Sequence, residues 1–429
     1  MSFPSSPVAE KTPGRAAFAF ILVTVALDFL AFGLIAPVNP DLVRGFVGGD
    51  FARASSITGY FFLAWATMQF IFSPIIGAWS DRFGRRPVIL ISCFGTGIDY
   101  VLMALAPSLR WLFVGRLISG IATSNVATAF AYITDVTPPD KRARAFGFIS
   151  AAFGLGFVIG PAVGGLLGNI NLRLPFWVAA ALSLANALYG YFVLPESLPK
   201  ERRAKSAWHM ANPLSSLKLF GLHPELTGLA AVLTLYYLAH NSLMSVWTLY
   251  TEYRYTWNNR DVGLSLAVVG VSAALVSGLL VGPFVKRFGE RVSLLFGLLF
   301  GTIGFVCFGL APYGKLVLAT IPFIALWGIA APPIQSLMSR HVDPSSQGKL
   351  QGAISSIRAV TSMAGPILFT QVFAAAISPG VKFHVPGAPY LVAAVLLLSS
   401  LLLAVFVTRP GAAPAAVPQP AADTSSIAP

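Results

Sequence analysis

Long apolar runs separated by short polar loops fill almost the whole chain. Twelve of these runs are each long enough to cross a bilayer as a helix, which satisfies its own backbone hydrogen bonds in lipid. Their approximate ranges are 16–38, 57–78, 88–107, 111–133, 145–168, 174–194, 226–250, 262–285, 292–311, 316–338, 350–377 and 389–407. The pattern predicts an all-α membrane protein with twelve transmembrane helices.

A repeat within the sequence divides these helices into two groups of six. A shift of 205 positions carries Gly77, Arg82, Phe83, Gly84, Arg86, Gly147, Gly160 and Pro161 onto identical residues. Such a match predicts two parallel six-helix pseudo-repeats related by an axis along the membrane normal. We expect a cytoplasmic N-terminal segment (1–15), an N-terminal six-helix bundle (16–194), a cytoplasmic linker (195–225), a C-terminal six-helix bundle (226–408) and a disordered, Pro/Ala-rich cytoplasmic tail (409–429).

Composition and charge agree with this class of protein. Hydrophobic residues make up 56% of the chain and charged residues only 10%, against about 25% charged in a soluble domain. The net charge of +13 comes mostly from loops that share one side of the membrane if both termini are cytoplasmic. It therefore indicates topology and not nucleic-acid binding. Cys93 and Cys307 both lie in apolar runs, so neither a disulfide framework nor a metal site is expected.

The loop between the second and third predicted spans, "GAWSDRFGRRPV", carries more than topology-fixing charge. Its glycines allow the backbones of two helices to approach at a tight turn. Asp81 has arginines close by in sequence and could form a latch with them that differs between two conformations. The candidate residues are Gly77, Ser80, Asp81, Arg82, Gly84, Arg85 and Arg86.

This loop resembles the signature of the major facilitator superfamily, and the resemblance extends over essentially the whole chain. It implies the major facilitator fold and a cytoplasmic gate in this loop. The companion residues implied by the resemblance are Asp135, Lys141, Arg142 and Arg144 in "TDVTPPDKRARAFG". The second-half copy, "GPFVKRFGERV", has Lys286 in place of Asp81, so we expect the acidic latch on one side only.

Small residues mark the fifth span, in "GLGFVIGPAVGG". Small residues spaced along a helix let its neighbours approach closely, and proline removes one backbone hydrogen bond. The pattern of Gly156, Gly160, Pro161, Gly164 and Gly165 is similar to the one that drug exporters of the superfamily carry in this helix, where it implies antiport.

Three charged residues fall inside the spans of the first half. Asp28 and Asp99 lie at similar depth in spans one and three, and intramembrane acids are by default functional, often as proton relays. The alternative is an acid neutralised by a structural hydrogen bond. Arg116 matches a span-four arginine that the resemblance links to proton coupling, although an arginine near a helix end also snorkels to the interface.

Several stretches resemble the tetracycline/proton antiporters, among them "TVALD", "GIDYVLMALAP" and "GRLISGI". By this resemblance Gln69 and Asn125 join the substrate cavity. That branch has a histidine in span eight and an aspartate in span nine, where this chain has Ala273 and Gly301. His240 in span seven could compensate for them, or pack with a neighbour as a structural polar residue.

The sequence therefore predicts a proton-coupled antiporter that exports a small amphipathic molecule or drug, tetracycline-like, across a bacterial inner membrane by alternating access. Its partners are the substrate, protons and the lipid bilayer, and no cofactor is expected because a proton gradient drives transport. We expect a monomer and leave an oligomer open. A transporter of a metabolite such as a sugar or organic acid, and a receptor without transport, stay open as alternatives. An enzyme is not expected, because no phosphate loop, metal cluster or nucleophile–base pair occurs.

Overall fold

The computed structural model describes residues 15–204, 219–220, 224–343 and 346–409. Within these ranges the regular structure is helical, and eleven segments are long and apolar enough to span a membrane. The prediction of an all-α membrane protein is confirmed. Most of the predicted segments 1–15 and 409–429, and the linker between 205 and 218, lie outside the described residues.

The N-terminal bundle holds the helices that follow one another up to Val193. They are α1 (Arg15–Ile35), α2 (Asn39–Phe46), α3 (Phe51–Phe83), α4 (Arg85–Leu105), α5 (Leu109–Ala122), α6 (Val126–Val136), α7 (Arg142–Ile170) and α8 (Leu174–Val193). The short 3₁₀ segment Thr123–Asn125 joins α5 to α6. The sequence pattern did not predict α2, an amphipathic helix that begins with a proline at its first turn.

The C-terminal bundle repeats this order. It holds α10 (Pro224–Tyr255), α11 (Asn259–Leu275), α12 (Val281–Leu310), α13 (Gly314–Ala325), α14 (Ala331–Ser339), α15 (Gln347–Ile377) and α16 (Ala388–Val407). Two of the twelve predicted spans, 262–285 and 292–311, lie within one continuous helical stretch, Asn259–Leu310. For this reason the structure has eleven candidate spans. Gly289, with φ +76°, is the point where the chain turns inside that stretch.

The turns at Gly84 and Gly289 show the repeat in three dimensions. Both glycines have positive φ, +106° and +76°, which residues with a Cβ rarely adopt. They lie 205 positions apart, and the helices after them end at Leu105 and Leu310, again 205 apart. The two bundles therefore share one backbone plan.

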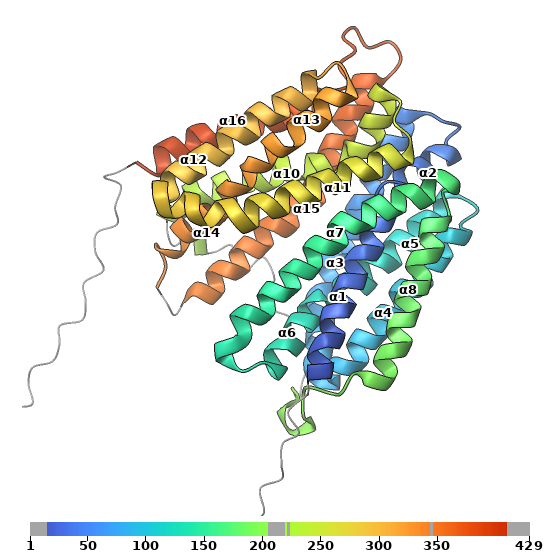
Figure 1. Cartoon of the computed structure of the whole chain (residues 1–429), viewed down its shortest axis with the longest axis vertical. Coiled ribbons are helices and arrows are strands. Elements are labelled where there is room, and N and C mark those ends of the chain that lie inside the picture. Colours follow the sequence, from blue (N-terminus) through green and yellow to red (C-terminus); the bar gives the residue numbers. More distant parts are fainter. Residues whose placement is uncertain (1–14, 205–218, 221–223, 344–345, 410–429) are drawn as a thin grey trace, which may run out of the picture.

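The bundles meet through two pairs of helices, α7 with α11 and α3 with α15 (Figure 1). A Cβ at Gly165 of α7 would lie 2.9 Å from the Cα of Gly263 of α11. We call this end, which also carries α2, the α2 end, and the opposite end, at Gly84 and residues 195–204, the linker end. At the linker end a Cβ on Gly77, Gly147 or Gly348 would meet no atom within 4 Å. The bundles are thus packed together at the α2 end, and these three glycines at the linker end are not covered.

Aromatic side chains fill the core of the C-terminal bundle. Tyr250 packs edge-on against Tyr390, with ring centroids 4.8 Å apart. The Tyr250 hydroxyl donates a hydrogen bond to the Phe308 carbonyl over 2.6 Å. Paired rings of this kind add stabilisation beyond the area they bury. They join α10, α12 and α16 into one rigid unit.

Candidate functional site

Arg85 is the centre of the predicted gate loop. Its Nη1 lies 2.5 Å from Asp81 Oδ1, and its Nε lies 3.3 Å from Asp135 Oδ2. It also donates to the Ser80 hydroxyl over 2.6 Å. One arginine therefore ties the loop after α3 to the end of α6, entirely within the N-terminal bundle.

Glu196, which the sequence analysis did not single out, completes this loop. Its Oε1 accepts a hydrogen bond from the backbone N–H of Arg85 over 2.9 Å, at the first residue of α4. A carboxylate there satisfies a helix N-terminus and its dipole. Glu196 also pairs with Arg203 over 3.5 Å. The only sequence signal was an acid just after the sixth span, which the basic residues of the linker masked.

The remaining predicted gate residues are held elsewhere at the linker end. Arg86 donates to the Tyr191 carbonyl over 2.6 Å, and Arg142 donates to the Thr134 carbonyl over 3.1 Å. Arg82 and Arg144 lie over the neighbouring rings of Phe83 and Phe148, 5.2 and 5.6 Å from the ring centroids. The structure thus groups Ser80, Asp81, Arg85 and Asp135 and leaves these other arginines out of that ion-pair cluster.

The C-terminal bundle carries the same ion pair with its charges reversed. Glu290 lies 205 positions after Arg85, and Arg340 lies 205 positions after Asp135. Glu290 Oε1 lies 2.7 Å from Arg340 Nη2. The expectation of a latch on one side only was therefore wrong, because it compared Asp81 with Lys286 and overlooked Glu290.

Asp28 lies near the middle of α1 and is half-buried. Its carboxyl group interacts with the side chain of Asn125, which is only 4% exposed. Gln69, on α3, is also half-buried, and its backbone carbonyl accepts a weak hydrogen bond from the Ser124 hydroxyl over 3.5 Å. Three elements of the N-terminal bundle thus present polar groups at this point: α1, α3 and the 3₁₀ segment after α5.

Asp99 lies deeper, between α4 and α5. It is fully buried, and neither of its carboxyl oxygens has a hydrogen-bond partner among the described residues. Arg116, 7% exposed, is close enough to act on it electrostatically. The guanidinium donates to the Met103 sulfur over 2.6 Å. An arginine this deeply buried does not snorkel to the interface, so the structure argues against that alternative.

The small residues of α7 serve two packing faces. A Cβ at Gly160 would lie 2.7 Å from the Cα of Gly33 of α1, and one at Gly156 would lie 2.8 Å from the backbone nitrogen of Leu30. Gly164 also packs on α1, whereas Gly165 faces α11 of the other bundle. Pro161 lies within a continuous helix. This motif brings α1, α7 and α11 together at backbone distance.

A cavity of about 280 Å³ lies between α10 and α15 in the C-terminal bundle. Its lining residues are Tyr237, His240, Asn241, Arg358, Thr361 and Ser362. Arg358 donates to the Tyr237 hydroxyl over 2.8 Å, and the Asn241 amide donates to the Thr361 carbonyl over 3.2 Å. Of these residues the sequence analysis named only His240 as a cavity candidate. The signal for Arg358 was present, since an arginine inside a predicted span is rare.

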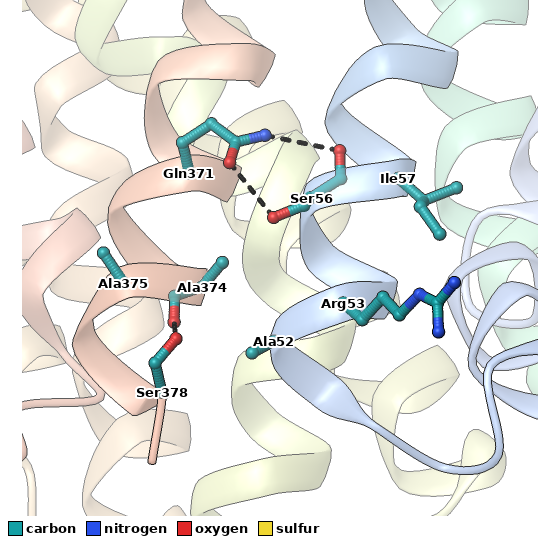
Figure 2. Close-up of a pocket in the computed structure, with 8 residues that line it drawn as sticks. All are labelled: Ala52, Arg53, Ser56, Ile57, Gln371, Ala374, Ala375 and Ser378. Atoms are coloured by element: carbon teal, nitrogen blue, oxygen red, sulfur yellow. Dashed lines mark hydrogen bonds between the residues drawn. The ribbon is translucent and has the colours of Figure 1, made fainter. Parts of the chain in front are cut away.

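A second hollow, of about 590 Å³, lies between α3 and α15 at the α2 end. Figure 2 shows Ser56 and Gln371 pointing toward each other across it, with a hydrogen bond of 3.0 Å from the Ser56 hydroxyl to Gln371 Oε1. Beside it, the Ser55 hydroxyl donates to the Thr370 carbonyl over 2.9 Å. These bonds join the two bundles.

A cluster of charges also joins the bundles at the α2 end. Arg44 of α2 pairs with Asp41 and, over 3.3 Å, with Glu252 of α10. Asn259 of α11 donates to Asp41 over 3.0 Å. Asp41 and Glu252 are 8% and 6% exposed. Sequence reasoning missed this cluster because its members lie in the first or last turns of elements about 200 positions apart.

No group of three His, Cys, Asp or Glu side chains placed to hold a metal ion occurs in the described ranges. Each bundle has a polar site near the middle of its helices. Contacts join the two bundles at the α2 end, and ion pairs lie at the linker end. Such a plan fits a carrier whose binding site lies at the repeat interface.

Comparison with known proteins gives the family. Residues 21–366 match the model of the Major Facilitator Superfamily. The chain is 40% identical to the tetracycline resistance protein, class C, of Escherichia coli, over 88% of this chain and 95% of that protein. It is 36% identical to the class G protein of Vibrio anguillarum, over 84% and 91%.

Solved structures share the fold. The human organic anion transporter MFSD10 (TETRAN) superposes with a TM-score of 0.66 at 24% identity, over 91% of this chain and 99% of that chain. The nucleoside transporter NupG superposes with a TM-score of 0.72 at 15% identity, over 91% and 98%. The chain therefore belongs to the major facilitator superfamily and is a membrane transporter, related to the tetracycline resistance proteins, and not an enzyme.

Proposed function

We propose that this transporter exports a small amphipathic molecule, tetracycline or a compound like it, in exchange for protons. It works by alternating access in a bacterial inner membrane, with both termini in the cytoplasm and with the two bundles bounded as the sequence predicts. The working unit is the monomer, because each chain holds both bundles and the space between them.

The observation that carries the proposal is the position of Asp28. Asp28 lies in the middle of a spanning helix, beside buried Asn125, and it is only partly buried, whereas Asp99 is fully buried. An intramembrane acid that water can reach is able to take up and release a proton. Asp99 and Arg116 lie buried in the same bundle and supply a second acid and a fixed positive charge.

The contacts between the bundles support alternating access. Hydrogen bonds and an ion pair join them at the α2 end, whereas the ion pairs of the gate loop stay within the N-terminal bundle. We infer that this conformation admits substrate from the linker end, which is the cytoplasmic side in our orientation. Export then requires the α2 contacts to separate and the linker ends to meet.

Transport in liposomes tests the exchange of drug for protons. The full-length protein is reconstituted, a pH gradient is imposed, and labelled tetracycline is followed with protein-free liposomes as control. We expect tetracycline to move against the direction in which protons flow, and a proton ionophore to abolish its accumulation. Movement of drug and protons in the same direction would refute antiport.

The identity of the substrate needs a separate experiment. Susceptibility of an efflux-deficient bacterial host that expresses the protein is measured over a panel of tetracyclines and unrelated amphipathic drugs. We expect raised tolerance to at least one tetracycline, in line with the names of the relatives. No change for any tetracycline, with exchange of a sugar or organic acid in liposomes, would favour the metabolite transporter.

A further inference from the structure

We propose that the cavity between α10 and α15 is a subsite for an acidic oxygen group of the transported molecule, a carboxylate or an enolate, with Arg358 as its anchor. The proposal rests on the proposed function, because it assigns the chemical class of the substrate at the same central site. It concerns Tyr237 and Arg358, which take no part in the proposed proton exchange, and His240, which the sequence offered only as a substitute for the missing titratable residues.

Arg358 is a cation without a counter-ion. It lies near the middle of α15, is exposed to the cavity, and has no carboxylate oxygen within 4.0 Å among the side chains that the structure describes. Several other arginines do have one: Arg85 pairs with Asp81, and Arg44 with Glu252. A charged side chain in a membrane span is costly and normally pairs with an opposite charge or faces a water-filled cavity. An anionic substrate group supplies that missing charge.

Tyr237 holds the guanidinium in place for such a group. Its hydroxyl accepts a hydrogen bond from Arg358 Nη2 over 2.8 Å, and its ring centroid lies 5.0 Å from Arg358 Cζ. Contact with an aromatic face and one hydrogen bond fix the plane of the guanidinium. The remaining N–H groups form the flat fork that matches two oxygens of a carboxylate or enolate.

The rings of Tyr237 and His240 in the cavity wall suit an aromatic body attached to the acid, and buried rings support them from behind. His240 lies in the cavity with its ring centroid 5.5 Å from that of Trp327, and Tyr236 packs on the same tryptophan at 4.8 Å. The Asn241 amide donates to the carbonyls of Tyr237 and Thr361, over 2.8 and 3.2 Å. Its two donors hold α10 and α15 together and are not available to a ligand.

The cavity faces the N-terminal bundle. Asn241 and Thr248 lie seven positions apart on α10 and so share one face of that helix. Thr248 donates a weak hydrogen bond to the carbonyl of Ala36, the residue just after α1, over 3.5 Å. A molecule anchored on Arg358 therefore lies on the side of α10 that is directed toward the bundle with Asp28.

A matched pair of probes tests the proposal on the full-length protein in lipid nanodiscs. Titrations use 2-naphthoate, an aromatic acid, and 2-naphthamide, which keeps the ring and loses the charge. We expect the wild type to prefer the acid, and Arg358→Gln to weaken naphthoate binding by about tenfold while changing naphthamide binding by less than about twofold. Arg358→Lys keeps the positive charge but loses the planar guanidinium, so its affinity for naphthoate should lie between those of the wild type and Arg358→Gln.

Controls separate the pocket from general charge and from folding. Arg260→Gln removes a positive charge from an exposed position at the start of α11 and should leave both affinities unchanged. If Arg358→Gln does not fold, Tyr237→Phe removes only the supporting hydroxyl and should weaken naphthoate binding alone. Equal binding of both probes to the wild type, no measurable naphthoate binding, or equal loss for both probes would overturn the subsite.

The outcome is distinguishable from that of the proposed function. Proton-linked tetracycline export by a protein that shows no preference for naphthoate would refute the subsite and leave antiport standing. A preference for naphthoate that depends on Arg358, in a protein whose drug flux ignores the pH gradient, would support the subsite and refute antiport.

Discussion

The two bundles share a backbone plan but differ in the charges that they carry. The N-terminal bundle holds two acids and Arg116 within its spans, whereas the central cavity of the C-terminal bundle holds an arginine and a histidine. The shift of 205 positions that relates their turns takes Asp99 to Gly304 and Arg116 to Ile321. The two copies therefore share the course of their helices, whereas the charged side chains inside the spans differ from one copy to the other.

The packing of α12 explains why the second copy has no acid in that region. A Cβ on Gly301 would lie 2.7 Å from Trp327 and Leu397, and one on Gly304 would lie 2.5 Å from Ile324. A carboxylate needs room and hydrogen-bond partners, and these glycines offer neither. At the linker ends the pair of Arg85 and Asp135 recurs as Glu290 and Arg340 with its charges reversed, which preserves the attraction, and Arg85 has Asp81 as a second partner.

The largest effect is expected from the acids of the N-terminal bundle. Asp28→Asn should reduce pH-gradient-driven tetracycline transport in liposomes to the background of protein-free liposomes, because an amide cannot exchange a proton. Asp99→Asn should weaken transport without abolishing it. Asp140→Asn, at an exposed position outside the spans, is the control and should behave as wild type. Full activity in both Asp28→Asn and Asp99→Asn would remove the proton-relay account.

A charge swap at the linker end tests the equivalence of the two ion pairs. Arg85→Glu places three acids together and should lower the transport rate about tenfold. The triple variant Asp81→Lys, Arg85→Glu, Asp135→Arg copies the charges of the C-terminal pair and should recover most of that loss. Arg82→Glu makes the same charge change next to Phe83 only, so an effect as large as that of Arg85→Glu would contradict the comparison.

A methyl group tests the tight packing of the second copy. Gly301→Ala should destabilise the protein by about 1–3 kcal/mol, because the new Cβ overpacks against Trp327. Gly282→Ala, whose Cβ would meet no atom within 4 Å, should leave stability unchanged. The measurement is thermal unfolding in detergent by intrinsic fluorescence. Equal stability of the two variants would mean that α12 is not closely packed at Gly301.

The smallest effect concerns the contact between the bundles. Arg44→Gln leaves the buried Glu252 without its cation. It should raise the equilibrium constant for separation of the bundles at the α2 end by about threefold. The shift is modest because the Arg44 side chain is 27% exposed. Spin labels at exposed Arg110, in the first turn of α5, and exposed Lys382, in the loop between α15 and α16, report the distance between the two bundles at this end. An unchanged distance distribution would show that the cluster does not hold this end closed.

Apolar runs were sufficient to predict the helical class, because membrane spans have a length set by the bilayer. Identical residues 205 positions apart predicted the repeat. The turn at Gly289 was predictable as well, because the charged residues between positions 286 and 291 interrupt the hydropathy pattern between the predicted spans 262–285 and 292–311. Acids inside spans were recognised at once because they are rare there. Asp28 and Asn125 were both named from sequence, and the structure places them together.

Features that depend on pairing across the fold were not predictable. Arg44 and Glu252 lie more than 200 positions apart, and each by itself is an ordinary charge at a helix end. Arg358 was visible as an arginine inside a span, but only the structure places it against Tyr237 and His240. The repeat shift of 205 positions places Glu290 and Arg340 at the positions of Arg85 and Asp135, but it is the structure that shows them in contact.

The most direct test of this division compares Asp28→Asn with Arg358→Gln in the same liposomes. Tetracycline affinity and the number of protons moved per tetracycline are measured for both. We predict that Asp28→Asn loses proton movement and keeps its tetracycline affinity within about threefold, while Arg358→Gln loses about tenfold in affinity and keeps the proton ratio of the wild type. The same defect in both variants would contradict the assignment of proton exchange to one bundle and substrate binding to the other.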